Sequence, residues 1–169
     1  NGGSRKVLGL FKSGGKTQEI FRIDPTQVYP DHEPTLPEMT EAALGILEKN
    51  RKGFFLMVEG SQVDWAGHNN DPIYMVTDFI AFDDAVKVAV DFAKEDGQTL
   101  VMAYPDHNTG GMKIGHYHTA MAYTETTIED LVDPLKNMKI TSVGLTAMMG
   151  GDYSIGNIIA KVDEYWSLD

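Results

Sequence analysis

The sequence predicts an α/β fold in which helices flank a parallel β-sheet. Two short apolar runs support this prediction, FFLMV at 54–58 and TLVMAY at 99–104, because a strand covered by helices on both faces is apolar throughout. Between these runs, apolar residues recur at helical spacing from Val76 to Ala93. Strand, helix and strand in this order make a right-handed βαβ unit. We expect Phe55, Met57, Leu100 and Met102 in its core.

The amino-terminal part is predicted to hold one more strand, a loop and a helix. The run VLGLF at 7–11 is bounded by polar residues and is expected to be a buried strand. Residues 13–37 contain four prolines and are expected to form a loop. A helix is expected from Leu36 to about Asn50, because Pro37 suits its first turn and apolar residues follow at helical spacing.

The central helix is expected to end near Lys94, with Gly97 as its stop signal. Most of its aspartates are assigned to a polar face, and one of them could instead be a ligand (Asp78, Asp83, Asp84 and Asp91). Beyond residue 116 the sequence predicts helices at 126–135, 141–149 and 154–166, the last with Ser154 as its cap. We therefore expect one α/β domain over residues 1–169, with residues 116–169 as a helical insertion or cap.

Composition limits the classes of partner. The net charge of −11 and the pI near 4.7 argue against a nucleic-acid partner, because phosphate backbones require basic patches. No stretch approaches the roughly 18–20 apolar residues of a membrane span. The chain has no cysteine, which excludes disulfides and thiolate metal ligands. It starts at Asn1 without a methionine or a signal-peptide pattern, so we expect a processed product or a fragment.

Metal-type side chains follow both predicted strands of the βαβ unit. Glu59 comes directly after the first strand, and Asp64 and His68 are four residues apart, so on a helix their Cβ atoms would lie about 5–6 Å apart. Asp106 and His107 follow the second strand. Ligands of open α/β sheets bind beyond the carboxyl ends of the strands, so these residues are predicted to form a metal site. Imidazole combined with carboxylate suits zinc better than calcium.

An ordinary structural interpretation of the same residues stays open, in which the carboxylates are solvated and Asp106 caps a turn. The other histidines are weaker candidates. His32 lies in the proline-rich loop and is expected to be exposed to solvent. His116 and His118 form HYH, which would share a face in a strand but is expected to belong to a loop.

These segments together resemble the alkaline phosphatase family. The resemblance extends from about Val7 to Gly115 and is carried by five stretches: GLF at 9–11, PTLPEMTEAALGIL at 34–47, GFFLMVEGSQVDWAGHNND at 53–71, FDDAVKVAVDFAKEDGQTLVMAYPDH at 82–107 and NTGGM at 108–112. It implies hydrolysis of phosphate monoesters through a phosphoserine intermediate, at a site with two zinc ions and one magnesium ion. It also implies a periplasmic or secreted protein and a homodimer.

The resemblance assigns the predicted ligands residue by residue. Glu59 matches the family's magnesium-binding glutamate. Asp64 and His68 match ligands of the first zinc, and Asp106 and His107 match ligands of the second.

Several family features are absent from the sequence. None of the six serines stands in the family's Asp-Ser-Ala setting, and no arginine matches the phosphate-binding one. The family's aspartate that bridges the second zinc and the magnesium would precede this chain. His118-Thr119-Ala120 resembles only in part the family's last zinc ligand, a His-Thr-Gly histidine, and Tyr104-Pro105 replaces its Thr-Ala.

We therefore expect a carboxy-terminal fragment that is inactive alone because it lacks the nucleophile. Two alternatives remain at this stage. One is a non-catalytic metal-binding or interaction module, and the other is a phosphomutase of the same superfamily.

Overall fold

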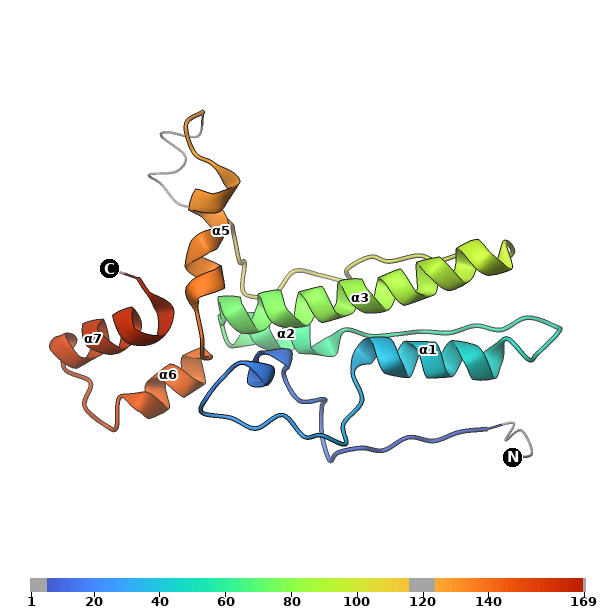
Figure 1. The fold of residues 1–169 in the computed structure, drawn as a ribbon, viewed down its shortest axis with the longest axis horizontal. Helices are drawn as coiled ribbons and strands as arrows, with labels where there is room; N and C mark the ends of the chain where they lie inside the picture. The colour runs from blue at the N-terminus through green and yellow to red at the C-terminus, as the bar shows by residue number, and fades with distance from the viewer. Residues whose placement is uncertain (1–5, 116–123, 169) are drawn as a thin grey trace.

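The computed structural model describes residues 6–115 and 124–168, and its regular elements are helices (Figure 1). A 3₁₀-helix comes first in the chain, followed by the α-helices; their bounds are η1 Glu19–Arg22, α1 Leu36–Leu47, α2 Ser61–His68, α3 Pro72–Asp96, α5 Ile128–Asn137, α6 Ser142–Met148 and α7 Ile155–Trp166. In Figure 1, α1, α2 and α3 form one layer, and α5, α6 and α7 lie beyond one end of it. None of the described helices is long and apolar enough to cross a bilayer.

The predicted parallel sheet is wrong for the described ranges, which contain no strand. Residues 54–58 form part of a stretched segment running beside α1, and residues 99–104 run along α3 (Figure 1). Residues 7–11 are also stretched out, toward the amino terminus. A strand requires backbone N–H and C=O partners on a neighbouring strand. A helix satisfies its own backbone groups, so a segment that lies along a helix finds no such partners there.

The predicted core of these segments is also wrong. The four residues expected there are largely exposed: Phe55 to 87%, Met57 to 68%, Leu100 to 82% and Met102 to 69%. Alternate residues are partly covered, and the Phe54 ring packs edge-on against Phe92 of α3 with centroids 6.0 Å apart. The helices therefore cover one face of the segment at 54–58, and its other face is exposed.

The helices expected at 36–50, 76–94, 126–135, 141–149 and 154–166 are confirmed as α1, α3, α5, α6 and α7, and local signals explain them, whereas η1 lies in the stretch that was expected to be a loop. Thr35 and Glu38 form a capping box at the start of α1, where Pro37 occupies the first turn. Ser154 caps α7 through the backbone N–H of Asn157. Gly97 ends α3 in the left-handed conformation, with φ of 68°.

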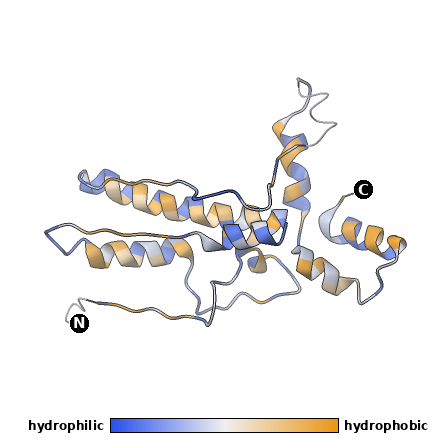
Figure 2. Ribbon diagram, turned by 180° about the vertical axis from the view of Figure 1, so that it is seen from behind, coloured by the Kyte–Doolittle hydropathy of each residue, from blue (hydrophilic) through white to orange (hydrophobic). Residues whose placement is uncertain are grey.

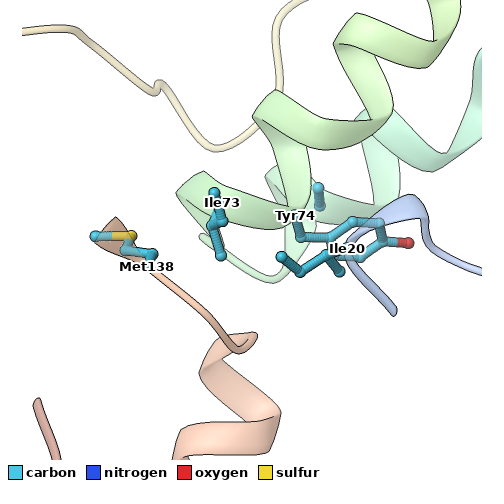
Figure 3. Packing of buried hydrophobic residues seen from close by; sticks show 5 residues of the cluster. Ile20, Ile73, Tyr74 and Met138 are labelled. Atoms are coloured by element: carbon cyan, nitrogen blue, oxygen red, sulfur yellow. The ribbon is translucent and has the colours of Figure 1, made fainter. Parts of the chain in front are cut away.

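The main core lies where η1 meets α2 and α3. Ile20, Ala66, Ile73 and Tyr74 are buried there, and Met138 joins them from the segment after α5 (Figure 3). Figure 2 shows hydrophobic residues along most of α3 and hydrophilic residues at its carboxyl end. Because α1, α2 and η1 all pack against α3, that helix organises this part of the chain.

Asp78 is an exception to the polar face that the sequence predicted for most aspartates of α3. Its side chain is only 6% exposed and accepts a hydrogen bond from the backbone N–H of Glu19 at 3.1 Å. Burial raises the pKa of Asp78 to about 7, and the negative charge of Glu19 adds to this rise. The exposed Asp83 and Asp84 agree with the polar-face prediction.

Candidate functional site

Asp64 and His68 occupy neighbouring turns of α2. The helix begins after Gly60, whose backbone turns the chain out of the extended segment. The distance between His68 Nε2 and Asp64 Oδ2 is 3.5 Å, with side-chain exposures of 68% and 38%. The four-residue spacing therefore places a carboxylate and an imidazole on one accessible face of the helix.

Asp106 and His107 form a second pair, in the loop that follows residues 99–104. His107 Nε2 lies 3.3 Å from Asp106 Oδ2, and both side chains are exposed. Each pair thus presents one carboxylate oxygen and one ring nitrogen to solvent.

Thr109 joins the two pairs, a residue that the sequence analysis did not single out. Its hydroxyl donates a hydrogen bond to Asp64 Oδ1 at 2.8 Å and lies 3.0 Å from His107 Nδ1. Asp64 and His107 are 43 positions apart in the chain, so this contact is a tertiary one. A hydroxyl residue directly before two glycines, in the NTGG stretch, was the only sequence signal for it.

Two glycines allow the loop to reach α2. A Cβ atom on Gly67 would lie 2.7 Å from the backbone oxygen of Thr109, closer than van der Waals contact permits. A Cβ atom on Gly110 would in turn collide with the backbone oxygen of Gly67, and Gly110 has φ of +74°. The close approach of these two backbones holds Thr109 against the carboxyl end of α2.

Glu59 stands apart from these residues. It is exposed at the end of the extended segment and makes no hydrogen bond or ion pair within the described chain. In the same ranges, no three residues among the His, Asp and Glu side chains come close enough together to hold a metal ion. His32 is exposed, as expected, whereas His116 and His118 lie outside the described residues.

The positive side chains near η1 are engaged by other residues. Lys16 Nζ donates to the carboxylate of Glu19, and Arg22 Nε donates to the same group at 2.6 Å. The Arg22 guanidinium also stacks 3.7 Å from the centre of the Tyr29 ring. Burial alone would raise the pKa of Glu19, but the hydrogen bonds from Lys16 and Arg22 hold it below its usual value. Neither cation is therefore available to the Asp64 and His107 region.

The donor chemistry of the two pairs suits zinc. Carboxylate oxygen and imidazole nitrogen are both zinc ligands, and a catalytic zinc takes three protein ligands. Each pair offers two such donors, so further ligands would have to come from outside the described residues. The described residues thus form two carboxylate–imidazole pairs connected by one hydroxyl group.

Comparison with known proteins gives a consistent result. A family model described as alkaline phosphatase matches residues 2–149. The chain is 48% identical to alkaline phosphatase 3 of Bacillus subtilis over 110 residues, which is 65% of this chain and 22% of the relative. It is 44% identical to the alkaline phosphatase of Escherichia coli K12 over 118 residues, 61% of this chain and 25% of the relative.

A solved structure agrees with these relatives. The cold-active alkaline phosphatase from the psychrophile Shewanella sp. superposes with a TM-score of 0.60 at 30% identity, covering 80% of this chain and 31% of that one. The chain thus spans between a fifth and a third of the length of these proteins.

Proposed function

Because the chain belongs to the alkaline phosphatase family, we propose that the complete gene product hydrolyses phosphate monoesters. The observation that carries this proposal is the joining of Asp64 and His107 by the Thr109 hydroxyl, which brings both carboxylate and imidazole pairs to one place. The relatives with the highest identities quoted above are themselves named alkaline phosphatases, which supports the same activity.

Charge explains why cations belong to this site. Asp64 and Asp106 would repel a phosphate dianion, and Lys16 and Arg22 are held by Glu19. Bound metal ions reverse the sign of the local charge. We therefore propose two zinc ions and one magnesium ion, which when bound would stabilise negative charge on the phosphoryl group.

Each residue of the pairs has a proposed role toward these ions. Asp64 and His68 contribute to the first zinc site, Asp106 and His107 to the second, and Glu59 to the magnesium site. The exposure of both pairs leaves room for a substrate and for ligands supplied by other parts of the protein.

The nucleophile is proposed to be a serine that forms a phosphoserine intermediate. No serine of this sequence stands in an Asp-Ser-Ala setting, so the chain alone is expected to be inactive. A periplasmic or secreted location and a homodimer are further parts of the proposal, and a nucleic-acid partner is not.

The decisive experiment uses the complete gene product and an aryl phosphate. Hydrolysis should be abolished by a chelator, restored by zinc with magnesium, and reduced at least 10²-fold in Asp64→Ala or His107→Ala, roughly as for loss of a positioned catalytic group. Asp84→Ala, an exposed aspartate of α3, is the matched control and should retain full activity. Chelator-resistant hydrolysis, or full activity in Asp64→Ala, would refute the proposed site.

The 169-residue chain itself provides a second test. It should show no turnover of the same substrate with zinc and magnesium added, and weak zinc binding that weakens further in His68→Ala. Turnover near that of Bacillus subtilis alkaline phosphatase 3 would mean that a nucleophile is present.

One observation favours a second candidate, an interaction module. The outer faces of residues 54–58 and 99–104 carry exposed apolar side chains, including Phe55 at 87% and Leu100 at 82%. Activity distinguishes the two candidates, because an interaction module would not hydrolyse the aryl phosphate even as the complete gene product. Sedimentation velocity would then show the chain associating equally well with and without a chelator.

A further inference from the structure

The Thr109 hydroxyl has a single proton and two neighbours, and this limits how the site is hydrogen-bonded. An ionised Asp64 carboxylate can only accept, so the hydroxyl proton must point to Oδ1 at 2.8 Å. The 3.0 Å contact with His107 Nδ1 then requires that nitrogen to be the donor. In its neutral form, His107 therefore carries its proton on Nδ1.

The consequence appears at the other ring nitrogen. In this tautomer Nε2 carries a lone pair, and it lies 3.3 Å from the carboxylate oxygen Oδ2 of Asp106. Two acceptors this close repel each other unless a cation interacts with both, and that cation is either a metal ion or a proton on Nε2. The tautomer that Thr109 selects therefore leaves His107 and Asp106 as a ready pair of cation ligands.

We propose that Thr109 is a positioning residue for both proposed zinc sites, orienting the Asp64 carboxylate and fixing the tautomer of His107 through one hydroxyl group. This rests on the proposed function, which assigns Asp64 and His107 to different zinc ions. A hydroxyl shared between them couples the two sites, since displacing Thr109 alters one ligand of each.

The packing of the loop explains how a short side chain can do this. Thr109 is partly buried, and the contact between Gly67 and Gly110 fixes its backbone against α2. The contact between the two backbones therefore sets the position of the Thr109 hydroxyl. If this hydroxyl is removed by substitution, the loop should not be able to move and compensate for its loss.

The test compares Thr109→Val, which keeps the shape and removes the hydroxyl, with Thr109→Ser, which keeps the hydroxyl. Zinc affinity of the chain is measured by competition with a chromophoric chelator. We expect Thr109→Val to bind zinc about 10–100-fold more weakly, as for loss of a group that orients a metal ligand, and Thr109→Ser to restore binding. Thr146→Val on α6 is the matched control, because in the described part of the chain its hydroxyl bonds to the backbone oxygen of Ser142 and to no other group.

A second measurement requires no metal. Long-range ¹H–¹⁵N NMR of the metal-free chain should show His107 protonated on Nδ1, and this preference should be lost in Thr109→Val but kept in Thr109→Ser. A purely structural threonine would not change the tautomer.

The two measurements distinguish the possible failures. If the wild-type chain binds no zinc, its two-donor pairs do not hold zinc without further ligands, and the NMR result alone decides whether Thr109 orients His107. If zinc binds and Thr109→Val has unchanged affinity, or if His107 carries its proton on Nε2 in the wild type, the role of Thr109 is refuted.

Discussion

The substitution Asp78→Asn should change how the stability of the chain depends on pH. Asp78 lies buried on α3 beside Glu19, with Lys16 also close enough to affect its charge, and the charge of Asp78 in turn raises the pKa of the buried Tyr74. Its pKa is raised from 3.8 to about 7, mainly by burial. The folded state therefore holds this proton more tightly than the unfolded state does.

The sign follows from this difference. The contribution of Asp78 to stability is complete below the unfolded pKa and is lost as pH rises through the folded pKa. Each pKa unit corresponds to about 1.4 kcal/mol, so between pH 5.5 and pH 8 the wild type should lose about 2 kcal/mol at this site. Asparagine has no charge to bury and keeps a carbonyl oxygen for the Glu19 N–H, so the variant should not show this loss.

The assay is urea unfolding followed by circular dichroism at several pH values above the pI near 4.7, where net charge favours solubility. The difference in unfolding free energy between Asp78→Asn and wild type should grow by about 2 kcal/mol in favour of the variant. Asp84→Asn replaces an exposed aspartate on the same helix, so its difference in unfolding free energy from wild type should not change with pH. A constant difference for Asp78→Asn as well would refute the argument that its carboxylate is destabilised by burial.

Three further predictions concern packing and helix capping. Gly67→Ala places a Cβ atom 2.7 Å from the Thr109 carbonyl oxygen, so it should lower the free energy of unfolding by about 1–3 kcal/mol and weaken zinc binding; unchanged zinc affinity would contradict this. Thr35→Ala removes the capping box of α1 and should cost about 1 kcal/mol in urea unfolding, whereas Thr35→Ser should restore most of it. Phe55→Ser should change stability by less than about 0.5 kcal/mol, whereas Leu44→Ala, at a residue only 5% exposed, should cost about 2–5 kcal/mol. A large loss for Phe55→Ser would mean that this side chain is covered.

The sequence alone determined α1, α3, α5, α6 and α7, because their signals are local. The capping box at Thr35, the cap at Ser154 and the stop at Gly97 each act within one or two turns. The contact between Asp64 and His68 is also determined locally, because residues four apart on a helix lie on the same face.

The predicted sheet failed for the opposite reason. An apolar run such as 54–58 shows that a segment can be a strand, but pairing depends on a second segment placed beside it by the whole fold. In the described chain that neighbour is a helix, so Phe55 and Met57 are exposed and not in a core. Asp78 shows the same limitation, because its burial depends on η1, which lies some 60 positions away in the sequence.

The contact between the two candidate pairs was decided only by tertiary structure. The sequence identified Asp64, His68, Asp106 and His107 from their types and spacing, and expected a sheet edge to bring them together. The structure connects the pairs through Thr109, held by the contact between Gly67 and Gly110. A hydrogen bond between residues 45 positions apart depends on where two backbones meet, and the physical reason it escapes sequence analysis is that no local preference for helix, turn or burial encodes that meeting point.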